Sequence, residues 1–342
     1  MSKQYKIAAL PGEGIGTEVI AATLTILQQI AAKHNFLLQI DYGEIGQIAF
    51  DRHGNYLPEA TIKLCNEADG ILFGAVSKGG LLELRQEFDL FINLRPVKVF
   101  PSLINNSSLK SDRLTGVDIL FVRELVSGIY FGASGRVEEE GKYGYHTMQY
   151  YDWQIERIAK VALDKAQARK GLLTVAHKEN ALPHLPWTKL VTEIAREYPN
   201  VKVEPMLVDN LAMQLVINPQ HFDVVLAGNL FGDILSDLGG ALVGSIGLLG
   251  SASLNGTGFG LYEPIHGTAA DLAGKNKANP LGTLASAMMM LEQWGETVAV
   301  ADLQQAWNKI LARGYRTWDL YSQDSEIVTT HELVELFLKE LF

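Results

Sequence analysis

Short apolar runs alternate along the chain with longer segments in which apolar residues recur at helical spacing. The short runs predict β-strands at residues 6–10, 36–42, 70–74, 119–124, 172–176, 201–208 and 224–227. The longer segments predict helices from the 11–16 turn to about residue 33, at 58–66, 152–169, 187–197 and 229–238, from residue 280 onward, and twice more in the tail. Such alternation predicts a parallel α/β sheet.

The turn at 11–16 (PGEGIG) joins the first strand to the first helix. Dinucleotide-binding folds open in the same way, and Asp41 follows at roughly the distance of a ribose-binding acid. However, Gly12, Gly14 and Gly16 lack the third glycine one position later that the pyrophosphate fingerprint requires. A plain tight turn before a helix is therefore favoured over a Rossmann fingerprint.

The chain has 342 residues, more than a single core usually holds, which predicts two lobes or domains. Its formal net charge of -10 and the lack of any basic run argue against a nucleic-acid partner. The longest weakly polar stretch, 241–254, is glycine-rich and too short to span a membrane. Cys65 is the only cysteine and the N-terminus does not resemble a signal peptide, so the cytoplasm is the expected compartment.

Two carboxylates stand out just beyond the strand at 224–227. Gly228 and Asn229 let the chain turn into a helical pattern on which Asp233 and Asp237 lie four residues apart, and hence on one face. Like charges this close need a cation or a proton, and oxygen ligands without Cys or His favour Mg²⁺ or Mn²⁺ over Zn²⁺. For such a pair taken alone, an exposed helix face that meets only water is the commoner explanation.

Other charged residues follow predicted strands in the same way. Ligands of open α/β sheets bind beyond the carboxyl ends of strands, which is where Arg123, Lys178 and Asp209 stand. Two further arginines, Arg85 and Arg95, lie ten residues apart in LLELRQEFDLFINLRPVKVF. Arginine matches a carboxylate with a planar fork, and a buried lysine can act as a base, although most such side chains simply point into water.

Two irregular segments complete the pattern. Residues 133–150, with acidic residues and several tyrosines, are hairpin-like and predict an arm that packs against another subunit. Residues 261–280 (LYEPIHGTAADLAGKNKANP) predict a long loop, and a loop of this length inside a compact domain is usually functional.

The chain also carries, in order, LLELR, NLRPVKVFP, VRE, GIYFG, HKENAL, VDNLAMQLV, GNLFGDILSD, EPIHGTAADLAGK and ANP. Together these resemble the motifs of the metal-dependent β-decarboxylating dehydrogenases, which include isopropylmalate, isocitrate, homoisocitrate and tartrate dehydrogenases. The resemblance covers essentially the whole chain. It implies an α/β fold of the isopropylmalate/isocitrate dehydrogenase kind, with two α/β lobes around a shared sheet, and not a standard Rossmann fold.

The resemblance implies a division into two domains. A cofactor-side domain would comprise residues 1–90 and 244–342. A domain for substrate, metal and dimerisation would comprise residues 91–243, with the arm at about 133–150. The resemblance also implies a homodimer whose active sites are shared between subunits.

The implied reaction is the oxidative decarboxylation of a 3-substituted malate. Asp233 and Asp237 of one subunit, with Asp209 of the other, would hold Mg²⁺ or Mn²⁺ against the C1 carboxylate and C2 hydroxyl of the substrate. Lys178, also from the other subunit, resembles the base that removes the hydroxyl proton, and Tyr130 resembles the acid that protonates C3.

The implied substrate pocket joins charged side chains to an apolar wall. Arg85, Arg95 and Arg123 would clamp the two malate carboxylates. The remaining implied contacts are Leu81, Leu82, Asn180, Ala181 and Asp209.

The resemblance implies NAD as cofactor, bound by the loop after residue 262. The implied contacts are Glu263, His266, Gly267, Thr268, Ala269, Asp271, Leu272 and Asn279. Asp271 stands where NAD-using members carry an acid that accepts both ribose hydroxyls, and a carboxylate there would repel the 2′-phosphate of NADP.

Within the family, RELVSGIYFG and LFINLRPVKVFP look most like isopropylmalate dehydrogenases, which convert 3-isopropylmalate to 4-methyl-2-oxopentanoate and CO₂ in leucine biosynthesis. Leu81 and Leu82 resemble the wall around the isopropyl group, and leucines disfavour a third carboxylate. Homoisocitrate or isocitrate is the alternative substrate, because the 75–80 segment with Lys78 is shorter than the usual isopropylmalate loop and His177 stands in place of an aspartate.

A catalytically silent regulatory homologue is the alternative of another class. Such subunits tend to lose the metal aspartates, the lysine or the tyrosine. All of these residues are present here, which favours an active enzyme.

Overall fold

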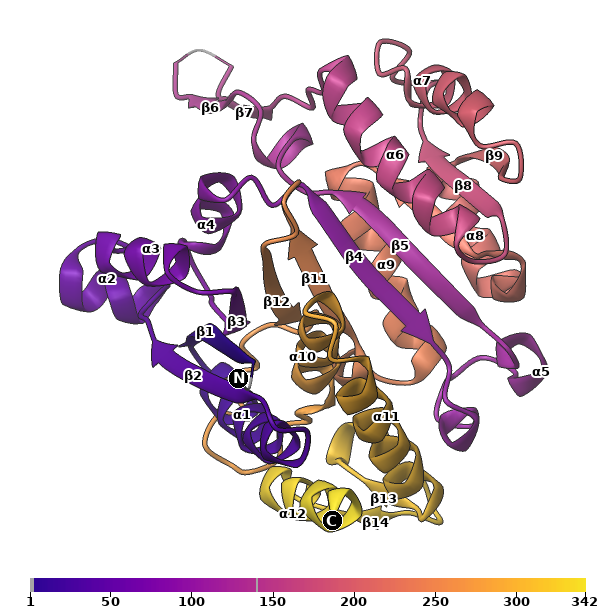
Figure 1. Cartoon of the computed structure of the whole chain (residues 1–342). Helices are drawn as coiled ribbons and strands as arrows, with labels where there is room; N and C mark the ends of the chain where they lie inside the picture. Colours follow the sequence, from indigo (N-terminus) through magenta and orange to yellow (C-terminus); the bar gives the residue numbers. More distant parts are fainter. Residues whose placement is uncertain (1–2, 140) are drawn as a thin grey trace.

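The computed structural model describes residues 3–139 and 141–342. Residues 1–2 of the predicted cofactor-side domain and residue 140 of the predicted arm lie outside the described residues. The centre of the molecule is one ten-stranded sheet with helices on both faces (Figure 1). Its strand order is β2-β1-β3-β12-β11-β4-β5-β10-β8-β9.

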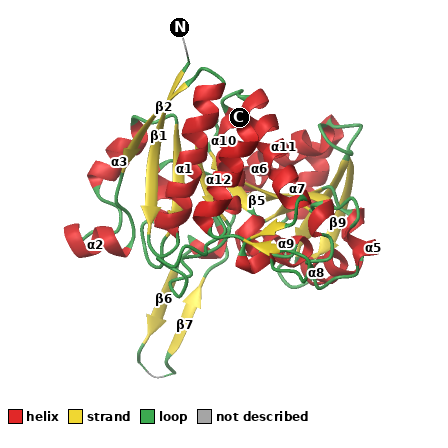
Figure 2. Ribbon diagram, turned by 90° about the horizontal axis from the view of Figure 1, so that it is seen from below, coloured by secondary structure: helices red, strands yellow, loops and turns green. Residues whose placement is uncertain are grey.

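The strands of this sheet span Gln4–Gly12 (β1), Leu37–Tyr42 (β2), Gly70–Ala75 (β3), Ile92–Lys98 (β4), Asp118–Glu124 (β5), Leu172–His177 (β8), Lys202–Leu207 (β9), Val224–Ala227 (β10), Gly250–Leu254 (β11) and Gly260–Pro264 (β12). A hairpin of Ser134–Val137 (β6) and Tyr143–His146 (β7) projects from the body of the molecule (Figure 2). Two short strands, Tyr315–Arg316 (β13) and Glu326–Ile327 (β14), pair near the C-terminus.

The helices span Gly16–Lys33 (α1), Gln47–His53 (α2), Glu59–Asn66 (α3), Leu81–Glu87 (α4), Ser111–Leu114 (α5), Asp152–Gln167 (α6), Trp187–Ile194 (α7), Val208–Ile217 (α8), Asn229–Val243 (α9), Leu281–Gln293 (α10), Thr297–Ala312 (α11) and Thr330–Leu341 (α12). A 3₁₀ turn at Gly128–Tyr130 (η2) follows β5. Within the described residues, no helix combines the length and the apolar character that crossing a membrane requires.

The predicted strands and helices are confirmed, with differences of a few residues at their ends. The predicted helix at 187–197, for example, is α7 continued by a 3₁₀ turn at Ala195–Glu197. The arm is confirmed as a hairpin, and its packing against another subunit stays a prediction.

The prediction of a parallel sheet is wrong for its centre. β4 runs antiparallel to both β5 and β11, and β11 runs antiparallel to β12. The pattern did not reveal β11, because its sequence GSASL is small and polar, nor β4, whose sequence INLRPVK is interrupted by polar residues. The first residues of the predicted 261–280 loop belong to β12. The pattern also did not reveal α2, α4, α5 and α8.

The strand order separates two groups of strands. β2, β1, β3, β12 and β11 come from residues 4–75 and 250–264, whereas β4, β5, β10, β8 and β9 come from residues 92–227. Two α/β lobes therefore share one sheet. The domain limits at 90, 91, 243 and 244 stay a prediction.

The alternation of side chains along β5 places its two faces in different surroundings. Leu120 and Val122 belong to the apolar cluster that contains Ile155 of α6. Phe121 belongs to the cluster of α9, and Arg123 reaches that helix as well. The carboxyl end of β5 therefore delivers an arginine to the face of the sheet that α9 covers.

Candidate active site

Helix α9 presents Asp233 and Asp237 on one partly open face. The helix begins directly after β10, and the two side chains are 34% and 50% exposed. Gly232 lets Arg123 lie along the helix, because a β-carbon at position 232 would stand only 2.7 Å from Arg123 Cγ. The predicted carboxylate pair therefore exists, and an arginine from another strand packs against it.

Two buried arginines pair with these aspartates. Arg123 Nη1 donates to Asp233 Oδ1 at 2.6 Å. Arg95 Nη1 lies 3.2 Å from the same oxygen and donates to Asp237 Oδ1 at 3.1 Å. It also donates to Ser236 Oγ at 2.8 Å. Because both arginines are nearly inaccessible, their charges act on the aspartates with little screening by water.

The two aspartates differ in their pKa. Burial raises the pKa of Asp233, but the charges of Arg123, Arg95 and Arg85 and the hydrogen bond from Tyr130 together lower it by more, so that its pKa lies below the usual value. Burial also raises the pKa of Asp237, and there the shift stays upward, with the negative charge of Asp233 adding to it. Asp237 is therefore the member of the pair that takes up a proton more readily.

Tyr130 and the third predicted arginine lie close to this cluster. The η2 turn brings the Tyr130 hydroxyl to Asp233 Oδ2, to which it donates at 3.0 Å. Burial, followed by the charge of Asp233, raises the pKa of Tyr130. Arg85 of α4 pairs with Glu263 of β12 at 2.7 Å, and both side chains are buried. This ion pair joins a predicted substrate residue to a predicted cofactor residue.

Lys178 and Asp209 form a second group. Lys178 follows β8, Asp209 lies in the first turn of α8, and Lys178 Nζ donates to Asp209 Oδ1 at 2.6 Å. The side chains are 28% and 63% exposed, and this hydrogen bond lowers the pKa of Asp209. Within the described part of the chain, no hydrogen bond or ion pair joins this group to Asp233 or Asp237. In the same residues, no three His, Cys, Asp or Glu side chains gather as a metal-binding group.

The predicted substrate wall is partly open to solvent. Leu81 packs against an apolar cluster of the first lobe, whereas Leu82 is 40% exposed. Asn180 and Ala181 are exposed in the turn after β8. The backbone N–H of Ala181 donates to the Lys178 carbonyl at 2.9 Å, so Lys178, Asn180 and Ala181 belong to one hydrogen-bonded turn.

The part of the predicted cofactor loop that follows β12 is tied to the glycine-rich turn after β1. The Ile15 amide donates to the Thr268 carbonyl at 2.8 Å. Gly14 has φ +60°, and a β-carbon there would stand 2.1 Å from that carbonyl oxygen. Close approach of two loops thus explains this glycine. Leu272 packs against Ile15 nearby, Ala269 adopts a positive φ and Gly267 is exposed.

The polar side chains of the loop differ in whether they have hydrogen-bond partners within the described residues. His266 Nε2 is buried without a hydrogen-bond partner among the described residues, and burial lowers the pKa of the ring. Asp271 is exposed and makes no hydrogen bond or ion pair with another described residue. Asn279, in contrast, donates to Asp319 at 2.9 Å and accepts from the Leu281 amide at 3.0 Å. Its side chain is therefore committed to the start of α10.

The sequence argument did not identify Asn229, Ser236 or Tyr150 as site residues. Asn229 is fully buried and accepts hydrogen bonds from Arg123, and the Tyr150 hydroxyl accepts one from the Asn229 amide. The one available signal was a polar residue at the first position of a helix directly after a buried strand. Without the fold, that signal indicates only a turn.

Comparison with known proteins identifies the family of the chain. The family model described as isocitrate/isopropylmalate dehydrogenase matches residues 6–337. The chain is 45% identical to 3-isopropylmalate dehydrogenase of Carboxydothermus hydrogenoformans, with 98% of this chain and 95% of that one covered. It is 42% identical to 3-isopropylmalate dehydrogenase of Chlorobium chlorochromatii, with 98% and 99% covered. The structure of isocitrate dehydrogenase from Methylococcus capsulatus matches with a TM-score of 0.90 and 30% identity over 98% of this chain and 99% of that one. The chain therefore belongs to the isocitrate/isopropylmalate dehydrogenase family.

Proposed function

We propose that this protein is an NAD- and divalent-metal-dependent dehydrogenase that converts 3-isopropylmalate to 4-methyl-2-oxopentanoate, CO₂ and NADH. The observation that carries the proposal is the convergence of Arg95, Arg123 and Tyr130 on Asp233 and Asp237. The names of relatives with 42% and 45% identity support isopropylmalate as the substrate. The proposed reaction is a step of leucine biosynthesis, and the cytoplasm is the proposed compartment.

The donor set fits a hard divalent cation. Asp233 and Asp237 offer only carboxylate oxygens, which are the ligands that Mg²⁺ and Mn²⁺ prefer, and they lie one helical turn apart on a partly open face. The partner subunit's Asp209 would complete the ligand set. When bound, Mg²⁺ or Mn²⁺ would polarise the substrate oxygens as a Lewis acid, and NAD would accept hydride from C2.

The arginines would bind and orient the substrate. A planar guanidinium matches a carboxylate in two hydrogen bonds, so Arg85, Arg95 and Arg123 suit a malate dianion. Arg95 and Arg123 now pair with Asp233 and Asp237, and a substrate carboxylate would compete for their N–H groups. Because Arg85 is held by Glu263, it would also fix the distance between substrate and cofactor loop.

Lys178 and Tyr130 would carry out the two proton transfers, one from the C2 hydroxyl and one to C3. The partner subunit's Lys178, after its ammonium has given a proton to solvent, would take the proton from the C2 hydroxyl as a neutral amine. The contact between Lys178 and Asp209 holds this side chain beside a proposed metal ligand. Tyr130 would give its proton to C3 after CO₂ leaves. Its phenol is protonated at neutral pH, as a general acid requires, and burial and the charge of Asp233 raise its pKa further.

NAD would bind at the loop after β12. Among the described residues, the buried Nε2 of His266 has no hydrogen-bond partner and the Asp271 carboxylate pairs with no other side chain, so that Asp271 could accept the ribose hydroxyls. Contacts of Glu263, Gly267, Thr268, Ala269, Leu272 and Asn279 with the cofactor are part of the same proposal. For Asn279 they would involve the backbone, because its side chain is engaged.

A homodimer would complete the site. The outer faces of α8 and α9 expose apolar side chains that a second subunit would cover: Met213, Val216, Ile217 and Ile234. Asp209 is exposed on the same helix α8 and pairs with Lys178. Covering this face would bring both residues toward the partner subunit, which supports a shared site.

Isopropylmalate is favoured over a tricarboxylate by the surroundings of the candidate cations. His177 Nδ1 lies 3.7 Å from Glu179, so a carboxylate of the protein already faces it. Lys78 is exposed in the short 75–80 segment, which Glu13 holds through Ser77 Oγ at 2.5 Å. Leu82 offers an apolar contact near Arg85, which suits an isopropyl group and provides no hydrogen-bond donor for a third carboxylate. Homoisocitrate and isocitrate are the alternative substrates.

The test is NADH formation by the purified protein with Mn²⁺ and equal concentrations of 3-isopropylmalate, isocitrate or homoisocitrate. We expect a clear preference for 3-isopropylmalate and loss of activity when the metal is chelated. A preference for either tricarboxylate would overturn the assignment of the substrate but leave the proposed oxidative decarboxylation in place. Inactivity on all three substrates would favour a silent homologue.

A further inference from the structure

Asn229 uses every polar group of its side chain inside the protein. Its Oδ1 accepts two hydrogen bonds from Arg123, from Nη2 at 2.7 Å and from Nε at 3.1 Å. Its Nδ2 donates to the carbonyls of Leu125 at 2.9 Å and Ser127 at 2.8 Å. The side chain is 0% exposed, so water replaces none of these bonds.

The oxygen and the nitrogen of the Asn229 side-chain amide hold two different parts of the site. The oxygen fixes the guanidinium of Arg123, leaving its Nη1 to meet Asp233. The nitrogen fixes the chain between β5 and η2, the turn that carries Tyr130, whose hydroxyl meets the other oxygen of Asp233. Asn229 itself begins α9, one turn before Asp233.

Tyr150 secures the same junction from outside the helix. The hydroxyl of Tyr150 accepts a hydrogen bond from the backbone N–H of Asn229 at 2.7 Å. It also lies against the start of η2, because a β-carbon at Gly128 would stand 2.2 Å from the same hydroxyl oxygen. Asn229 therefore cannot shift without moving the turn and the helix together.

No other residue type reproduces these bonds. Aspartate has the same shape but cannot donate to two carbonyls when ionised, and its charge would neutralise Arg123. Glutamine is longer by one methylene, and a fully buried position has no room for it. Alanine would leave the fork of Arg123 and both carbonyls without partners.

We propose that Asn229 is a positioning residue that sets Arg123 and Tyr130 at the correct distance from Asp233 for the substrate. This inference rests on the proposed function, since it assigns the substrate carboxylate to Arg123. It adds a residue that acts only through other residues and touches neither substrate nor cofactor.

The kinetic test compares Asn229→Asp and Asn229→Ala with wild type. We expect the KM for 3-isopropylmalate to rise roughly tenfold to a hundredfold, because small displacements of orienting groups have effects of that size. The KM for NAD should stay within about twofold. Asn106→Ala is the matched control. The side-chain amide of Asn106 also donates to a backbone carbonyl, that of Leu320 at 2.6 Å, but Asn106 lies outside the site. It should leave both constants unchanged.

A merely structural role gives a different result. It would lower the melting temperature and the amount of folded enzyme while leaving the substrate KM unchanged, and this outcome would overturn the proposal. A second test adds Asn229→Ala to Arg123→Met. If Asn229 acts through Arg123, the added change has little further effect on the substrate KM, whereas independent effects would multiply.

A spectroscopic test separates this inference from the proposed function. In protein with ¹⁵N-labelled arginine, the Nε–H of Arg123, identified by its absence in Arg123→Met, should exchange slowly with solvent. In Asn229→Ala the signal should exchange much faster, and in Asn106→Ala it should not change. Slow exchange that persists in Asn229→Ala would contradict the positioning role, even if wild type proved inactive on all three malates.

Discussion

The candidate active site has two groups of residues that differ in how they are held. The group around Asp233 is built from β4, β5, η2 and α9, and its arginines are almost completely buried. The group of Lys178 and Asp209 rests on one hydrogen bond between side chains that are 28% and 63% exposed. One chain therefore fixes the first group and leaves the second open.

This difference indicates which parts of the site one subunit can organise alone. The buried arginines are already oriented, so little conformational entropy is lost when a carboxylate binds them. An exposed lysine–aspartate pair gains little energy from its own contact, because water screens it. Such a pair becomes well ordered only when another surface covers it. We therefore expect the two groups to respond differently to substitution.

The largest expected effect is that of Asp233→Asn. The change removes the charge that pairs with Arg123 and Arg95 and, on the proposed function, a metal ligand. We expect turnover with Mn²⁺ to fall at least about 10²- to 10³-fold while the circular dichroism spectrum stays that of wild type. Asp302→Asn, which alters a surface ion pair with Lys33, is the control and should keep full activity. Near-normal turnover of Asp233→Asn would sink the metal assignment.

The second prediction tests whether the open group serves the other subunit. Lys178→Ala and Asp233→Asn should each be nearly inactive as pure proteins. When they are unfolded together and refolded, about a quarter of wild-type activity should return, because half of the dimers pair the two variants and each of these has one intact site of two. If both groups served the site of their own chain, mixing would restore nothing.

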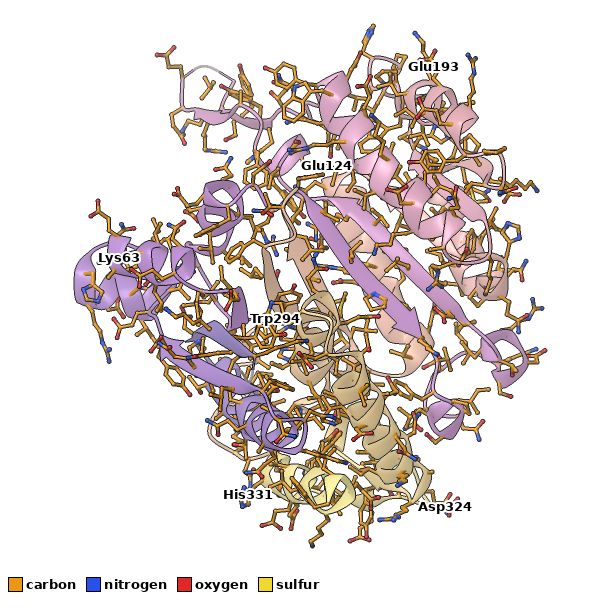
Figure 3. All side chains as sticks on the ribbon, viewed as in Figure 1. Lys63, Glu124, Glu193, Trp294, Asp324 and His331 are labelled. Carbon is orange, nitrogen blue, oxygen red and sulfur yellow. The ribbon has the colours of Figure 1, made fainter. Side chains whose placement is uncertain are left out.

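The third prediction concerns the cofactor loop, which is also exposed. Asp271→Lys should lower the ratio of kcat/KM for NAD to that for NADP by roughly tenfold to a hundredfold, the size of a lost hydrogen bond to a charged group. Glu193→Lys makes the same change of charge on α7, which lies with β8 and β9 and not with β12 and the loop, and should leave the ratio unchanged (Glu193 is labelled in Figure 3). An unchanged NAD preference in Asp271→Lys would remove this residue from the ribose site.

The last prediction concerns stability and not catalysis, and it tests a buried carboxyl next to Arg123 in the chain. Glu124, beside Arg123 at the end of β5 (Figure 3), is fully buried, and burial raises its pKa to about 7 against the opposing hydrogen bond from Ser127 and charge of Arg157. The folded chain thus binds this proton more tightly than the unfolded chain does. Its stabilising contribution is complete below pH 4.5 and is lost as the pH rises toward 7.

Glu124→Gln removes this dependence. Urea unfolding of the variant and wild type at pH 5 and pH 8 should show that the variant gains relative stability at the higher pH, by at most roughly 3 kcal/mol at 1.36 kcal/mol per pKa unit. The groups that face Glu124 are Arg157, with a nitrogen at 3.7 Å, Ser127 and Tyr150. An equal difference in stability at both pH values would show that Glu124 does not titrate in this range.

The sequence by itself determined those features that depend on neighbouring residues. Asp233 and Asp237 share a helix face because four residues make about one turn, and the buried run of β10 places that helix at a strand end. The resemblance of the motifs named the family before the fold was known, and the family is confirmed. The roles of individual residues stay predictions, because neither the single chain nor the comparisons test them.

Only the tertiary structure decided what those local features meet. Arg123 and Asp233 are 110 residues apart, and their contact exists because β5 and β10 pair side by side in register. The antiparallel β11 has few apolar residues, and its place in the sheet depends on pairing with both neighbouring strands. Asn229 is a turn residue in the sequence and becomes the junction of Arg123 and the η2 turn only after the sheet has formed. Helical periodicity repeats within one turn and can be read locally, whereas these contacts depend on the packing of segments distant in the chain.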